Sequence, residues 1–166
     1  MEMNFLTLAI AALVPMIIGS IWYGPLFGNA WMQQMGFTKE SLEGSNMVAI
    51  LVLSYILSFM VAMFLSVFIV THQNGLFATL SGEPGFAEQT GEAFAYFQDF
   101  MNTYGDRFKT FKHGALHGGL MGVFFVLPIL AIQAMFEKKK TKYIAINAGY
   151  WIVCLAIMGG IVCQWG

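Results

Sequence analysis

Four long stretches of the chain contain no Asp, Glu, Lys or Arg, and more polar segments separate them. They cover residues 5–23, 47–71, 113–136 and 143–165. A helix rises about 1.5 Å per residue, so about 20 apolar residues cross the hydrocarbon core of a bilayer, which is about 30 Å thick. Because lipid offers no partner for backbone amides, such stretches are expected to be helical. The pattern therefore predicts an all-α fold, a four-helix transmembrane bundle that forms a single integral membrane domain over residues 1–166.

Two of the connections have an amphipathic pattern of their own. In the extramembrane insertion of residues 73–111, apolar residues recur every three or four positions over residues 91–104, which predicts a helix on an apolar surface. Such a helix would cap the bundle, rest among lipid head groups or form a lid for a partner. In the first loop, Phe27, Trp31 and Met35 are spaced four residues apart. Short interfacial helices are therefore expected in the 1–2 and 2–3 loops.

The composition agrees with a membrane protein. Hydrophobic residues make up 58% of the chain and charged residues 10%, whereas globular proteins have roughly 45–50% apolar and about 25% charged residues. The formal net charge of -1 leaves no basic surface for a nucleic-acid backbone. Nucleic acid is therefore excluded as a partner, and membrane lipid is expected.

The distribution of basic residues predicts the orientation in the membrane. The loop between the last two apolar stretches contains four lysines, at positions 138, 139, 140 and 142, and the first loop adds Lys39. The opposite side has Arg107, Lys109 and Lys112 in a long segment that also carries acidic residues. Basic residues in short loops favour the cytoplasmic side. Both termini are therefore predicted to lie outside the cytoplasm.

Small residues indicate how the helices associate, because lipid removes most of the apolar driving force and close backbone approach takes its place. Gly114, Gly118 and Gly122 recur every four positions in the third stretch, and Gly149 and Gly160 each follow an alanine by four positions in the fourth. These helix-packing faces suit a neighbour in the same chain or in a second copy of it. Both alternatives stay open, and self-association is the favoured one.

Two amides lie within the apolar stretches. Gln133 lies about one turn before the Lys-rich loop and Asn147 about one turn after it, so a helical hairpin places them at similar depth. We predict that they hydrogen bond, directly or through a water. This intramembrane contact would join the two helices, or it would bind a polar ligand in the bundle.

The three histidines of the chain are the most chemically suggestive residues. His72 ends the second stretch, and His113 and His117 begin the third, so all three are predicted to reach the same membrane face. His113 and His117 are one turn apart on one helix face. This spacing suits a transition metal, with Glu2, Cys163 or a loop carboxylate as a fourth ligand. The alternatives are a proton-sensitive gate and hydrogen bonds to loop carbonyls.

Common catalytic patterns are absent from the sequence. It has no G-x-S-x-G nucleophile motif, no Gly-rich phosphate-binding loop and no carboxylate pair within the apolar stretches. No catalytic residue and no cofactor is therefore assigned, and an enzyme is not the favoured interpretation.

Two groups of residues resemble a known family. Residues 22–32 read WYGPLFGNAWM at the end of the first stretch, and residues 146–150 read INAGY in the fourth. These runs resemble the domain-of-unknown-function 1761 family of small bacterial four-helix integral membrane proteins. The resemblance implies a multi-pass protein of the bacterial inner membrane and supplies no activity. The motif residues that carry it are Trp22, Tyr23, Gly24, Pro25, Phe27, Gly28, Trp31, Asn147, Gly149 and Tyr150.

Three functions are compatible with these features. The favoured one is a non-enzymatic, self-associating structural or binding subunit that contacts lipid or a partner membrane protein. The second is a small channel or transporter subunit with a polar pathway near the histidines, Gln133 or Asn147. The third is a metal-dependent membrane enzyme that uses His72, His113 and His117.

Overall fold

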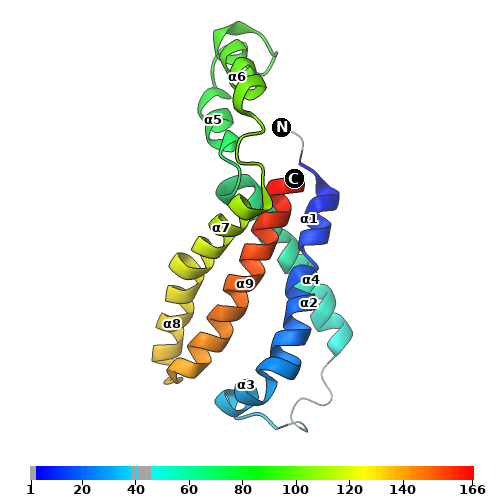
Figure 1. Cartoon of the computed structure of the whole chain (residues 1–166), viewed down its shortest axis with the longest axis vertical. Coiled ribbons are helices and arrows are strands. Elements are labelled where there is room, and N and C mark those ends of the chain that lie inside the picture. The colour runs from blue at the N-terminus through cyan, green and yellow to red at the C-terminus, as the bar shows by residue number, and fades with distance from the viewer. Residues whose placement is uncertain (1–2, 39, 41–45) are drawn as a thin grey trace.

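A computed structural model describes residues 3–38, 40 and 46–166 of the chain (Figure 1). Four helical segments in it are long and apolar enough to cross a membrane: Phe5–Leu26, Met47–Ile69, Phe111–Phe136 and Thr141–Trp165. No β-strand occurs among the described residues. The predicted all-α fold with four membrane-spanning helices is therefore confirmed.

The first span consists of helices α1 (Phe5–Ala11) and α2 (Val14–Ile21) and a π-helical turn, η1 (Trp22–Leu26). Asn4 caps α1 by accepting a hydrogen bond from the Thr7 amide. The break between α1 and α2 precedes Pro15, which has no amide hydrogen to continue the helical ladder. Helix α3 (Gly28–Met35) follows at once and is the short helix expected in the first loop.

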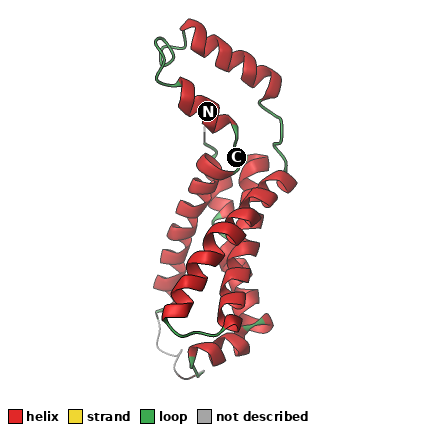
Figure 2. Ribbon diagram, turned by 90° about the vertical axis from the view of Figure 1, so that its left-hand side faces the viewer, coloured by secondary structure: helices red, strands yellow, loops and turns green. Residues whose placement is uncertain are grey.

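The second span joins α4 (Met47–Phe64) to a π-helical turn, η3 (Leu65–Ile69). Helices α5 (Gln73–Leu80) and α6 (Gly91–Tyr104) then project beyond the bundle as a hairpin (Figures 1 and 2). Helix α6 has the bounds that the sequence pattern predicts. Its aromatic side packs on α5 and the intervening turn, through the rings of Phe77, Phe86, Phe94 and Phe97.

The third span consists of α7 (Phe111–Met121), the π-helical turn η4 (Gly122–Val126) and α8 (Leu127–Phe136), and the fourth is the single helix α9 (Thr141–Trp165). Helix α9 lies between the first and third spans (Figure 1) and contributes the largest part of the core. Its buried side chains include Cys154, Leu155, Met158, Val162 and Cys163.

The glycines of the third span lie against α9 of the same chain. A Cβ atom on Gly114 would overlap the carbonyl oxygen of Gly159, and one on Gly118 would overlap that of Leu155. A Cβ on Gly122 would lie 2.7 Å from the Ile152 Cα. These three glycines are buried, so their face serves packing within the chain and is not free for a second copy.

Candidate metal centre

Three imidazoles from two distant segments meet at one end of the bundle. The Nε2 atoms of His72 and His113 are 2.9 Å apart. The rings of His113 and His117 are 4.6 Å apart between centroids, and His72 and His117 are 5.1 Å apart. One ligand nitrogen from each of the three lies within 4.8 Å of the others. The sequence expectation that the three histidines reach one membrane face corresponds to a cluster of side chains in the structure.

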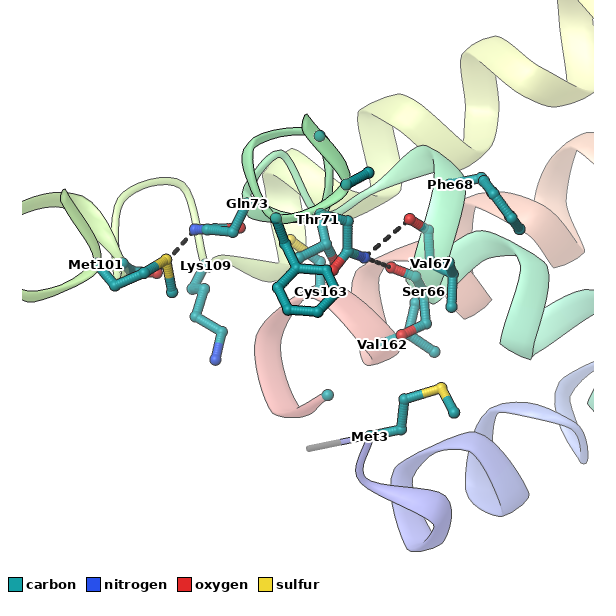
Figure 3. A pocket seen from close by; sticks show the side chains of 16 residues that line it. Met3, Ser66, Val67, Phe68, Thr71, Gln73, Met101, Lys109, Val162 and Cys163 are labelled. Carbon is teal, nitrogen blue, oxygen red and sulfur yellow. Dashed lines mark hydrogen bonds between the residues drawn. The ribbon is translucent and has the colours of Figure 1, made fainter. Parts of the chain in front are cut away.

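Two amides that follow His72 fix its position. The π-helical turn η3 leaves carbonyl oxygens of Ser66 and Val67 to be satisfied outside the helix, and the Asn74 amide donates to both, at 3.1 and 2.8 Å (Figure 3). The buried Gln73 amide donates to the Gly105 carbonyl at 2.8 Å. The start of α5 is thereby tied to η3 on one side and to the end of α6 on the other. Gln73 and Asn74 also line a cavity of about 580 Å³, and His72 lines a separate, smaller one of about 300 Å³ with Phe108.

The other two histidines occupy the first turns of α7. The Thr110 hydroxyl caps this helix by accepting a hydrogen bond from the His113 amide at 3.3 Å. Gly114, the next residue, allows α7 to touch α9 at Gly159. The cap sets where the helix begins, and the glycine contact sets its distance and rotation relative to α9. Together they direct His113 and His117 to the side where His72 lies.

Cys163 does not belong to the group of ligand atoms. Its thiol donates to the Val70 carbonyl at 3.7 Å and to the Phe108 carbonyl at 3.4 Å. It therefore joins α9 to the two chain segments that lead into the histidine cluster, as a positioning residue. Of the other fourth ligands considered, Glu2 lies outside the described residues, and no described carboxylate belongs to the cluster.

Phe108 covers the cluster in a strained conformation. Its φ angle is 65°, in the left-handed region that bulky residues rarely adopt. Its ring stacks on that of His113, with centroids 5.1 Å apart and an angle of 23° between planes. Such strain persists only where surrounding contacts hold it, and it concentrates at functional sites. The contact with His113 and the hydrogen bond from Cys163 supply that support.

The geometry is close to what a tetrahedral ion requires. Metal–nitrogen bonds of about 2.0–2.1 Å place neighbouring ligand nitrogens about 3.3 Å apart, whereas the shortest pair here is at 2.9 Å and the longest at most 4.8 Å. The 2.9 Å pair is a hydrogen bond between the two rings, which a bound ion would have to replace. The cluster is accessible from outside, because His72 is exposed and the other two are half-buried. Three imidazoles would leave a fourth position open to water or an anion.

The motif residues form a second cluster towards the opposite end of the bundle. The Trp22 indole donates to the Ile146 carbonyl at 3.0 Å, and the Tyr150 hydroxyl donates to the Pro15 carbonyl at 2.8 Å. A Cβ on Gly149 would lie 3.1 Å from the Trp22 ring. The aromatic end of the first span thus packs directly on the fourth.

The direct hydrogen bond predicted between Gln133 and Asn147 does not form. Gln133 is exposed on α8 and donates to the Glu137 carboxylate one turn later, at 2.8 Å. Asn147 points to the first span, where its Oδ1 accepts from the Tyr23 hydroxyl at 2.9 Å. The two amides therefore bond to different residues, Asn147 to the first span and Gln133 to the residue one turn after it.

Comparison with models of known protein families gives a match over most of the chain. The family described as "Protein of unknown function (DUF1761)" matches residues 6–163. The chain belongs to this family. No curated protein and no solved structure matches it significantly. The family assignment predicted from the motifs is therefore confirmed, and the function has to be inferred from the chain's own geometry.

Sequence reasoning missed the residues that support this DUF1761 chain's histidine cluster. Gln73 and Asn74 directly follow His72. Such a polar run after an apolar stretch indicates that side-chain hydrogen bonds hold the end of the helix in place. Phe108 carries no such signal, because its left-handed backbone and its stacking on His113 arise only in the folded chain.

Proposed function

We propose that this chain is a multi-pass membrane protein that binds one divalent transition-metal ion through His72, His113 and His117. One observation carries the proposal: residues 41 positions apart in the sequence place their imidazole nitrogens 2.9 Å from each other, with a third imidazole within reach. Imidazole nitrogen suits zinc, copper, nickel and iron. The caps and hydrogen bonds around the cluster support a site that is organised before the ion arrives.

Binding is favoured over catalysis. Hydrolytic metal sites need a group that accepts or donates a proton near the open coordination position, and no described carboxylate belongs to the cluster. Holding or transferring an ion needs only the three imidazoles and access from water. The exposed His72 provides that access.

His113 and His117 lie in the first turns of α7, at the end of the bundle where α1 begins and α9 ends (Figure 1). The sequence pattern predicts that the basic loops lie on the cytoplasmic side of the bacterial inner membrane. The ion would then reach the histidines from the other side of that membrane, outside the cytoplasm. Self-association stays a prediction. It would have to use a surface other than the glycine face of α7, which is buried against α9.

Metal content tests the proposal directly. The full chain is purified without a histidine tag, stripped with a chelator, incubated with Zn²⁺, Ni²⁺ or Cu²⁺ in turn and assayed by elemental mass spectrometry. We expect one ion per chain for at least one metal. The chain has three histidines in all, so His113→Ala together with His117→Ala removes two of three ligands. This double variant should weaken binding by at least about 100-fold, since loss of supporting residues alone costs about 10–100-fold.

The matched control is Gln133→Ala, which replaces an exposed polar residue of the same span at the far end. It should keep the stoichiometry of the unaltered chain. Substoichiometric metal in the unaltered chain, or an unchanged affinity in a folded double variant, would overturn the proposal. Nitrogen hyperfine couplings in the electron paramagnetic resonance spectrum of the Cu²⁺ form provide a second measurement of imidazole ligation.

A further inference from the structure

A separate cavity opens on the side of the bundle between α2, α4 and α9, and it is independent of the proposed metal site. It has a volume of about 570 Å³, within the range of roughly 300–1,000 Å³ that is typical of small-molecule sites. Every residue that lines it belongs to a membrane-spanning helix. Exposed apolar side chains of α4, among them Leu51 and Leu57, form its rim. A ligand would therefore enter from the lipid and not from water.

This cavity, called the lateral cleft below, has an aromatic wall formed by the end of the first span and by α9. Tyr23, Tyr150 and Trp151 line it, and the two tyrosine rings lie 5.1 Å apart. Both phenol hydroxyls donate to protein oxygens, on Asn147 and Pro15. Each phenol oxygen keeps a lone pair with which it can accept a hydrogen bond from a ligand. None of the residues that line the cleft is charged.

Ser58 of α4 supplies a polar group without a protein partner. The residue is only 4% exposed, it lines the cleft, and none of the hydrogen bonds found among the described residues involves its hydroxyl. No fully enclosed side-chain nitrogen or oxygen in the described part of the chain lacks a partner. The Ser58 hydroxyl therefore opens onto the cleft. A buried hydroxyl is costly to leave unpaired, so it favours a ligand that carries an oxygen.

We infer that the lateral cleft binds an uncharged single-chain lipid whose head carries a hydroxyl or carbonyl oxygen. The chain lies along the apolar wall between α2 and α4, and the head oxygen pairs with Ser58 and the tyrosine hydroxyls. A charged head group does not fit, because desolvating a phosphate or carboxylate without a basic partner costs far more than these neutral hydrogen bonds return. The occupant is thus a long-chain alcohol or a comparable neutral lipid.

Photochemical labelling tests this inference. The full chain in phosphatidylcholine nanodiscs is irradiated with 1-hexadecanol that carries a diazirine at mid-chain, and labelled peptides are mapped by mass spectrometry. We expect label on the cleft residues of α2, α4 and α9, with saturation at one probe per chain. Unlabelled hexadecanol should compete, and hexadecanoate at a pH where it is ionised should compete at least about tenfold less well.

Two substitutions separate the site from general lipid contact. Ser58→Phe fills the cleft and should abolish the competed label, and Ser58→Ala should weaken competition by roughly 3- to 10-fold, as for loss of one hydrogen bond. Ser66→Ala is the matched control, since Ser66 lies on η3 and does not line the cleft. Label spread evenly over the lipid-exposed helix faces, or equal competition by hexadecanoate, would overturn the inference. If Ser58→Phe fails to fold, the competition measured on the unaltered chain still decides.

Discussion

The second span, which contains α4, and the fourth span, α9, have similar lengths, 23 and 25 residues, but very different environments. The most apolar window of the α4 span has a mean hydropathy of 2.6 and is 17% buried, whereas that of α9 has a mean hydropathy of 1.9 and is 56% buried. The more apolar helix is thus the less buried one. In water the more apolar helix would be the more buried one, because burial is favoured by the removal of apolar surface from water. In a bilayer, lipid chains satisfy that surface equally well.

Small residues explain the difference. Helix α9 carries Gly159 and Gly160, which let the backbone of α7 and the ring of Phe111 come close. Helix α4 contains no glycine, and many of its large side chains point outward, among them Val48 at 73% exposed and Met60 at 57% exposed, while a narrow side with Ser58 and Ala62 is buried. Close backbone approach gives many weak contacts over a short distance. Figure 1 shows the result, with α7 alongside α9 and α4 diverging from them.

Each packing style corresponds to one of the two proposed sites. The close pair of α7 and α9 holds His113 and His117 in a fixed direction, as a metal site needs. The loose contact of α4 with α2 leaves the lateral cleft open to lipid. The following three predictions test this contrast between the close and the loose helix.

The largest expected effect comes from Gly118→Ala. The new methyl group would overlap the Leu155 carbonyl oxygen, which belongs to the backbone and cannot rotate away. Overpacking of this kind costs about 1–3 kcal/mol or more, and here it forces two helices apart. We expect a loss of about 3 kcal/mol or more in the free energy of unfolding, measured by titration with sodium dodecyl sulfate in mixed micelles.

Gly119→Ala is the matched control for this change. The nearest atom to its new Cβ is the Ala156 Cβ at 3.8 Å, an ordinary contact. Because alanine is the better helix former by about 1 kcal/mol, the control should be neutral or slightly stabilising. Equal destabilisation by the two substitutions would mean that α7 and α9 do not meet at Gly118.

A smaller effect is expected from truncating a leucine in the core. Leu155 on α9 is 2% exposed and Leu53 on α4 is 57% exposed. Leu155→Ala leaves a cavity among protein atoms and should cost about 2 kcal/mol, the lower end of the range for a buried leucine, whereas lipid fills the space left by Leu53→Ala, which should cost less than about 1 kcal/mol. The same unfolding titration measures both. Similar losses for both would show that α4 is covered by protein, as in a tight oligomer.

Much of the fold was predictable because the bilayer limits the choice of structure. Uncharged runs of sufficient length have to be helical in lipid, so the four spans follow from the sequence alone, and α6 follows from its three-to-four residue repeat. The exact ends of the spans were harder to predict, since the π-helical turns at Trp22–Leu26 and Leu65–Ile69 depend on packing and not on the pattern of apolar residues.

The candidate site was predictable only in part. The positions of His72, His113 and His117 relative to the loop implied one membrane face, but the rotation of each helix, which decides whether side chains meet, depends on contacts such as Gly114 with Gly159. The same uncertainty caused the error for Gln133 and Asn147. Depth follows from the residue count along a helix, whereas direction around the axis follows from partners that the sequence does not show.

The smallest expected effect concerns those two polar positions. Tyr23→Phe removes the hydroxyl that donates to Asn147 and should cost about 0.6 kcal/mol, the average for a hydrogen bond between membrane helices. Gln133→Leu replaces an exposed amide on α8 that bonds only within its own helix, so it should leave the free energy of unfolding unchanged or raise it slightly. A larger loss from Gln133→Leu than from Tyr23→Phe would mean that α8, like the buried side of α9, faces protein. A second copy of the chain packed on α8 would then be the simplest explanation, and crosslinking at the exposed Met135 on that helix would test it.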